Sequence, residues 1–113
     1  MKNNFCIIPW ISMTSDNAGL VRPCCKFAEK DVQGEYQTPN LKDHSYEDIW
    51  NGPEMQAIRQ AFLDSKKIPE CSSCWKEEAA GVFSNRQQYN TSYMPQINPN
   101  DYSTTYDKPP RVI

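Results

Sequence analysis

The chain has 113 residues, and its 12 basic and 14 acidic side chains give a formal net charge of −2 at pH 7. Leu, Ile, Val and Phe make up less than about 20% of the chain, a content typical of disordered proteins, but three Trp and six Tyr argue against disorder. The near-neutral charge gives no electrostatic reason to expect nucleic acid as a partner, and no apolar run reaches the roughly 18 residues that span a membrane.

The N-terminal residues, Met1 to Phe5, carry one positive charge but no long apolar stretch, so they do not resemble a secretory signal. We therefore expect a cytoplasmic location, where thiols stay reduced and disulfides are rare. The small aliphatic content predicts one thin-cored domain that gains stability from a metal or a cross-link.

A β-hairpin is expected over residues 5–27. Its first strand, 5–13, is apolar and β-prone but is interrupted by Pro9, and turn-forming residues follow it. Gly19 allows a positive-φ turn that folds the chain back. The polar stretch 28–44 predicts a loop.

Two or three helices are expected after this loop. Ser45 is the predicted N-cap of a short first helix. Pro53 lies in the first turn of a second helix, where its missing N–H costs nothing, and Pro69 ends that helix. A third helix is expected to begin near Cys71 and to run past Ala80.

The second helix has the pattern of one buried face, with apolar side chains at helical spacing and Arg59 among the residues that face water. On the third helix, Glu77 and Glu78 predict a solvated face. The apolar positions of the second helix are Met55, Ile58 and Phe62.

From residue 91 the composition shifts to Asn, Ser, Thr, Tyr and Pro. We therefore divide the chain into a cluster-binding domain at 1–90 and an extended linker or arm at 91–113. The closing triplet Arg111-Val112-Ile113 has the character of a strand that is just beginning. The expected fold is α+β: a small N-terminal hairpin, then two or three helices around a four-cysteine metal centre, with an extended C-terminal tail.

Cysteine spacing is the main functional signal. The pattern C-x12-G-x4-C is followed at a distance by C-x2-C. Four thiolates split between two distant halves indicate a soft-metal site that joins the halves of a small domain. The cysteines are Cys6, Cys24, Cys25, Cys71 and Cys74.

Four-sulfur coordination suits zinc and an iron–sulfur cluster equally well. Structural zinc sites usually pair two short C-x2–4-C motifs, whereas here the first half spans an entire hairpin. A cluster is wider than one ion, so its ligands can come from more scattered points. The spacing modestly favours iron–sulfur and leaves zinc open.

The sequence resembles the SPASM domain, the auxiliary-cluster extension of radical S-adenosylmethionine enzymes, and its shortened twitch form. The similarity covers about residues 5–89, and Ser84-Asn85-Arg86 is similar to an S-x-R stretch of that family. We expect this stretch to be an ordinary surface cap or a solvent-exposed arginine, and the alternative is a contact with a substrate or a partner domain. The other segments that carry the resemblance are Phe5-Cys6 with Pro9-Trp10, Arg22-Pro23-Cys24-Cys25, Ser45-Tyr46-Glu47-Asp48-Ile49-Trp50-Asn51 and Pro69-Glu70-Cys71-x-x-Cys74.

The resemblance implies that one 4Fe–4S cluster is bound by Cys6, Cys24, Cys71 and Cys74. Full SPASM domains continue with further cysteines and hold a second cluster, but no cysteine follows Cys74 here, so the one-cluster twitch form is the closer match. Cys25 either substitutes for Cys24 or stays a thiol beside the cluster.

Catalysis by this chain alone is not expected. The C-x3-C-x2-C motif of radical S-adenosylmethionine enzymes is absent, and 113 residues do not contain their barrel. The resemblance implies an N-terminal module or fragment that supports electron transfer or substrate positioning for a catalytic barrel in cis or in trans, with a peptide or a small molecule as substrate. The alternative is a stand-alone binding domain in which four cysteines hold one structural zinc ion.

Overall fold

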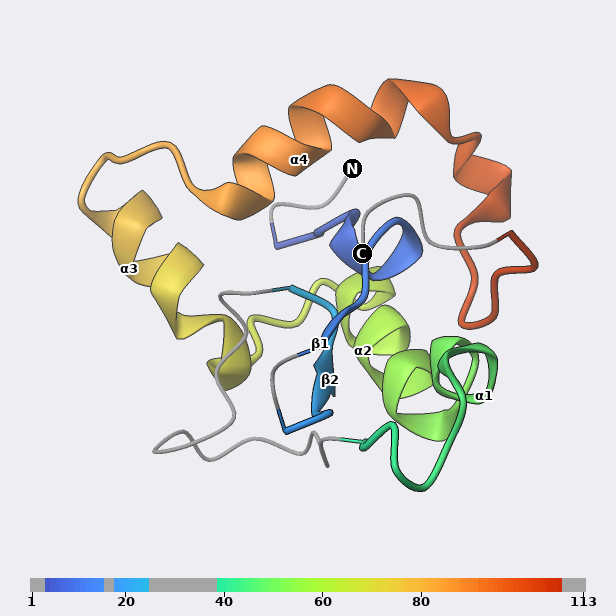
Figure 1. Ribbon diagram of the computed structural model, residues 1–113. Coiled ribbons are helices and arrows are strands. Elements are labelled where there is room, and N and C mark those ends of the chain that lie inside the picture. The colour runs from blue at the N-terminus through green and yellow to red at the C-terminus, as the bar shows by residue number, and fades with distance from the viewer. Residues whose placement is uncertain (1–3, 16–17, 25–38, 109–113) are drawn as a thin grey trace.

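A computed structural model describes residues 4–15, 18–24 and 39–108 of the chain (Figure 1). A short antiparallel hairpin near the N-terminus is followed by helices, which confirms the expected α+β class. Within the described ranges, no helix combines the length and the apolar character needed to cross a membrane. The elements in chain order are the 3-10 turn η1 (Ile8–Trp10), β1 (Thr14–Ser15), β2 (Val21–Arg22), α1 (Tyr46–Trp50), α2 (Pro53–Leu63), η2 (Pro69–Cys71), α3 (Ser72–Ala79), α4 (Asn85–Tyr93), η3 (Met94–Gln96) and η4 (Pro99–Asp101).

The first strand of the hairpin is shorter than the sequence predicted. The chain from Ile8 forms the turn η1 instead, in which the backbone N–H of Ile11 donates to the carbonyl of Ile8 at 3.0 Å. Pro9 explains the difference, because it has no N–H to give to a strand ladder and its fixed φ suits a turn. The paired residues of β1 and β2 are Thr14 with Arg22 and Ser15 with Val21.

Glycine is required at Gly19 because the hairpin packs closely against Asn40 and Leu41 there. Its φ is +84°, and a Cβ at this position would lie 2.9 Å from the side-chain oxygen of Asn40. The backbone N–H of Leu41 donates to the carbonyl of Gly19 at 2.9 Å, so the chain beyond the expected loop returns alongside the hairpin. Of that loop, residues 28–38 lie outside the described residues.

The helix starts agree with the sequence. The Ser45 hydroxyl accepts a hydrogen bond from the backbone N–H of Asp48 at 3.2 Å, which caps α1, and Pro53 lies in the first turn of α2. The apolar positions of α2 are buried as predicted: Met55, Ile58 and Phe62.

The expected third helix is divided into α3 and α4. Gly81 interrupts it with a φ of +79°, a conformation that a side chain disfavours. α4 then starts at a capping box, in which the Ser84 hydroxyl accepts from the N–H of Gln87 and the Gln87 side chain accepts from the N–H of Ser84. The two helices therefore lie at an angle, with a loop between them (Figure 1).

Arg59 does not face water as predicted but is fully buried. Its Nε donates to the carbonyl of Pro9, and its Nη1 donates to the carbonyl of Thr104, both at 2.9 Å. The guanidinium also lies over the Trp50 ring, 4.6 Å from the centroid, and its burial lowers the pKa to about 10. Arg59 thus joins three parts of the chain that are distant in sequence.

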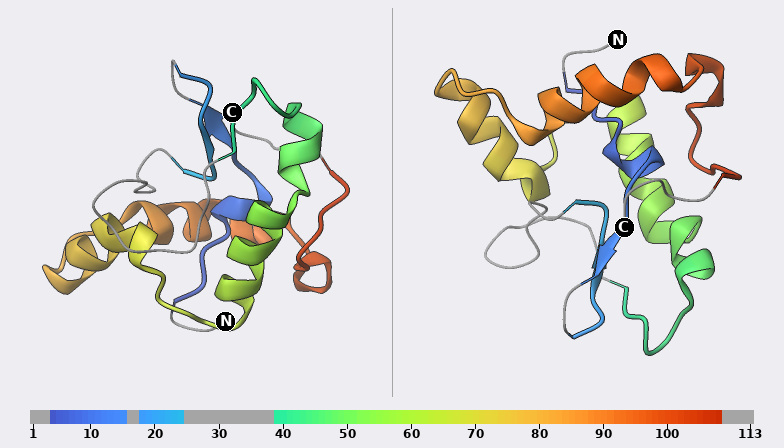
Figure 2. Two further views of the ribbon diagram at one scale, coloured as in Figure 1. Left: turned by 90° about the horizontal axis from the view of Figure 1, so that it is seen from below. Right: turned by 45° about the horizontal axis from the view of Figure 1, so that its top comes forward.

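The core is centred on the N-terminal segment, 5–13. Its turn η1 contacts both α2 and α4, and Figure 2 shows it lying between these helices. Phe5 stacks on Trp10 with ring centroids 5.3 Å apart, and the Tyr102 ring lies within 5.6 Å of both. The segment that carries the first cysteine is therefore the best-buried part of the fold.

The C-terminal segment, 97–108, has little regular structure but is bonded to the core. Ile97 and Tyr106 are buried. The indole N–H of Trp10 donates to the carbonyl of Ser103 at 2.9 Å, and that of Trp50 donates to the carbonyl of Lys108 at 2.8 Å. The C-terminal segment therefore packs along the surface of the core.

Candidate metal centre

Four cysteines from three separate parts of the chain line one cavity. Apolar side chains and one guanidinium complete its wall: Ile8, Pro9, Pro23, Phe62 and Arg86. We call the four thiols the cavity cysteines: Cys6, Cys24, Cys71 and Cys74. Cys25 lies outside the described residues. The exposed His44 is not among the residues that line this cavity.

Cys71 and Cys74 are placed by the start of α3. Pro69 begins the turn η2, in which the N–H of Cys71 donates to the carbonyl of Ile68 at 3.2 Å. Cys71 occupies the N-cap position of α3 without a side-chain capping hydrogen bond, and Cys74 follows one helical turn later on the same face. The indole N–H of Trp75 donates to the same carbonyl of Ile68 at 2.7 Å and fixes the approach to the helix.

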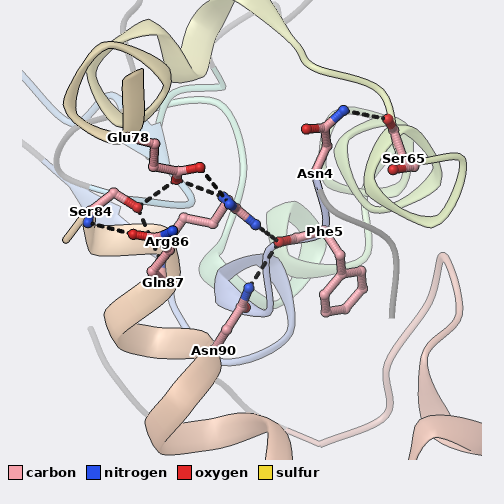
Figure 3. Close-up of polar contacts among 8 residues, drawn as sticks. All are labelled: Asn4, Phe5, Ser65, Glu78, Ser84, Arg86, Gln87 and Asn90. Atoms are coloured by element: carbon pink, nitrogen blue, oxygen red, sulfur yellow. Dashed lines mark hydrogen bonds and ion pairs between the residues drawn. The ribbon is translucent and has the colours of Figure 1, made fainter. Parts of the chain in front are cut away.

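Asn90, which no sequence pattern singled out, fixes the backbone on both sides of Cys6. The Asn90 amide donates to the carbonyl of Phe5 at 2.9 Å and accepts from the backbone N–H of Ile7 at 2.8 Å. These are the two residues that flank Cys6, whose side chain is 5% exposed. Figure 3 shows the first of these bonds, from α4 to the N-terminal segment.

Cys24 follows β2 and the buried Pro23, so the returning strand of the hairpin brings it to the cavity. It is half-buried, and the side-chain amide of Asn85 donates a hydrogen bond to its Sγ at 3.5 Å. Asn85 is the first residue of α4. A helix that carries no cysteine therefore contacts one of the cavity cysteines.

Burial controls the electrostatics of the thiols. It raises the pKa of Cys6 well above its usual range; a backbone hydrogen bond from Ile8 partly opposes this, and the other three thiolates add to it. Burial likewise raises the pKa of Cys71, with Cys74 and Cys24 adding to the effect and Arg86 opposing it. Four thiolates in this cavity would need compensating positive charge, which a bound metal centre would supply.

Arg86 does not take the solvent-exposed position that its place after a cap suggested, because it is 9% exposed and forms one wall of the cavity. Its Nε and Nη2 donate to the two carboxylate oxygens of Glu78 at 2.8 and 2.5 Å, and its Nη1 donates to the carbonyl of Phe5 at 2.8 Å (Figure 3). The guanidinium thereby joins α3 and α4 to the N-terminal segment.

Glu78 is a partner of this arginine and does not belong to the solvated face that the sequence indicated. The hydrogen bond from Arg86 holds the pKa of the Glu78 carboxyl below its usual value of 4.5, although partial burial opposes the shift. The Ser84 hydroxyl donates to the same carboxylate at 2.5 Å. Serine, glutamate and arginine therefore form one polar network beside the cavity.

The donor set suits an iron–sulfur cluster. Four thiols surround the cavity, and a 4Fe–4S cluster takes one cysteine thiolate on each of its four irons. Within residues 4–15, 18–24 and 39–108, no three His, Cys, Asp or Glu side chains are grouped closely enough to hold a metal ion. The four thiols line one cavity between three segments of the chain.

Comparison with known families agrees with this site. Residues 6–75 match the family model of SPASM, an iron–sulfur cluster-binding domain. The match begins at the first cavity cysteine and ends one residue beyond the last. No curated protein and no solved structure matches the chain.

Proposed function

Because the chain belongs to the SPASM family of iron–sulfur cluster-binding domains, we propose that its four cavity cysteines together bind one auxiliary 4Fe–4S cluster. The observation that supports this most is the convergence of all four thiols on one cavity. The same membership favours iron–sulfur over the zinc ion that cysteine spacing alone leaves open. Cys25 is the spare thiol in this proposal.

We propose electron transfer as the main role of the site. When bound, the cluster would accept and return one electron. Four thiolate ligands occupy a position on every iron, so no iron is left open to hold a substrate or S-adenosylmethionine. The apolar wall formed by Ile8, Pro9 and Phe62 limits the access of water to the thiols. An indirect role in positioning a substrate for the catalytic barrel is compatible with the same four ligands.

SPASM domains occur together with radical S-adenosylmethionine catalytic domains, and we propose such a barrel, in cis or in trans, as the partner. A peptide or a small molecule would be the substrate of that enzyme. Residues 1–90 would form the cluster-binding unit, and 91–113 would connect it to the barrel. Because 97–108 is bonded to the core, the point at which the connection leaves the unit would be fixed. A cytoplasmic location would keep the thiols reduced.

Metal analysis of anaerobically purified protein tests the cluster directly. We expect a brown protein with broad visible absorption and about four iron and four sulfide per chain. A colourless protein with one zinc per chain would contradict the proposal.

The partner is tested by the coding sequence that follows. We expect a C-x3-C-x2-C motif in frame or in the adjacent gene, and we expect the purified barrel protein to bind this chain. If the neighbouring genes encode no such motif and no barrel protein binds, the proposed partner is wrong, whereas the cluster itself is unaffected.

A further inference from the structure

We propose that Asn85 raises the reduction potential of the bound cluster through its hydrogen bond to Cys24. Its amide nitrogen lies 3.5 Å from the Cys24 sulfur, and it reaches that sulfur from a helix that supplies no ligand. Asn85 would act through Cys24, so it is a positioning residue and not a catalytic one. This inference rests on the proposed function, because it requires Cys24 to be a ligand.

The position of Asn85 is set by its two neighbours. Ser84 caps α4 and donates to Glu78 on α3, while Arg86 bonds both that carboxylate and the carbonyl of Phe5. Figure 3 shows these contacts of Ser84 and Arg86. Because Ser84 and Arg86 are both anchored, the Asn85 side chain loses little additional conformational entropy when it donates to the Cys24 sulfur. The hydrogen bond is therefore formed before the cluster accepts an electron.

The direction of the effect follows from charge. In the reduction, one electron passes from a one-electron donor to the cluster, and no covalent bond forms or breaks. The added negative charge is shared with the cysteine sulfurs, so a hydrogen-bond donor stabilises the reduced state more than the oxidised state. Removal of the donor therefore lowers the potential.

The test is a redox titration of the cluster-loaded chain, with dithionite as electron donor and the reduced cluster measured by electron paramagnetic resonance. In Asn85→Leu, we expect the ratio of reduced to oxidised cluster at the wild-type midpoint to fall by about threefold to tenfold, the range expected for one hydrogen bond. A tenfold change corresponds to about 59 mV for one electron. Gln88→Leu is the matched control, because it removes an exposed amide from the same helix.

A second variant keeps the inference testable if Asn85→Leu folds poorly. Asn85→Asp preserves size and suits the start of a helix, but it replaces the donor with a negative charge, so we expect an even lower potential. In the resonance Raman spectrum, we expect the iron–cysteine stretching band to shift to higher frequency in both variants and not in Gln88→Leu.

The outcomes separate the two proposals. Wild-type protein without iron would overturn the proposed function and this inference with it. A loaded wild type, with both Asn85 variants at the wild-type potential, would overturn the tuning role alone. Loss of the cluster from both variants would also overturn it, because Asn85 would then be needed for cluster assembly.

Discussion

At the residue scale, the adjacent pair Cys24 and Cys25 raises the question of which sulfur is the ligand. Cys24 lines the cavity and accepts the hydrogen bond from Asn85. We expect Cys24→Ser to lose most of its iron after anaerobic reconstitution and Cys25→Ser to retain about four iron per chain. The reverse pattern would assign the ligand role to Cys25.

The ion pair of Glu78 and Arg86 links α3 to α4 beside the cavity. Glu78→Gln leaves a poorly exposed guanidinium without its charged partner, because the two side chains are 18% and 11% exposed. We expect the free energy of unfolding in urea to fall by about 1.5–3 kcal/mol in the cluster-loaded protein. The exposed Glu47 provides the control Glu47→Gln, and equal stability of the two variants would contradict the assignment.

The pH dependence of this pair has a definite sign. The folded-state pKa of Glu78 lies below its unfolded value of about 4.5, so its stabilising effect is fully present above that pH and is lost as the pH falls through the folded-state pKa. The stability difference between wild type and Glu78→Gln should therefore be constant near neutrality and shrink in acid. A difference that grows in acid would contradict this account.

At the element scale, caps and prolines allowed the helix starts to be predicted from the sequence, because their effects are local. Ser45 and Pro53 act within one turn of the chain. The burial of Arg59 and Arg86 was not predictable in the same way, since their partners are backbone carbonyls 50 and 81 residues away. Every residue has the same backbone carbonyl, so the sequence does not indicate which carbonyl an arginine will bond.

Only part of the candidate site could be predicted from the sequence. The spacing of the cysteines identified the thiols, because soft-metal ligation constrains residue type. The contacts of Asn90 with the residues flanking Cys6, and of Asn85 with Cys24, depend on how α4 lies across the N-terminal segment. Amide side chains are common on helices and carry no such specificity on their own.

The C-terminal segment gives an element-scale prediction. Tyr106 is 4% exposed, and its backbone N–H donates to the Asn51 side chain at 2.9 Å. We expect Tyr106→Ala to lower the free energy of unfolding by about 3–5 kcal/mol, as for other buried aromatic residues. The neighbouring exposed Thr105→Ala should change it little, and similar small effects of both would mean that the segment is only a loose tail.

At the scale of the whole molecule, the cluster would join the N-terminal segment, the hairpin and α3, which meet at the cavity. The aliphatic content is too small for a large core, so metal binding and folding should be coupled. We expect anaerobic removal of iron with a chelator to reduce the helical signal in circular dichroism and to broaden thermal unfolding. An apo chain with an unchanged spectrum and a sharp transition would show that the core suffices.

The central claim is that four cysteines bind one 4Fe–4S cluster, and Mössbauer spectroscopy of chain reconstituted with 57Fe tests it most directly. The account predicts a single 4Fe–4S signal that contains nearly all of the iron, at about four iron per chain, with every iron site typical of sulfur coordination. It also predicts the loss of this signal when Cys71 is replaced by Ser. A spectrum of mononuclear or unspecifically bound iron, or a signal unchanged by the substitution, would contradict it.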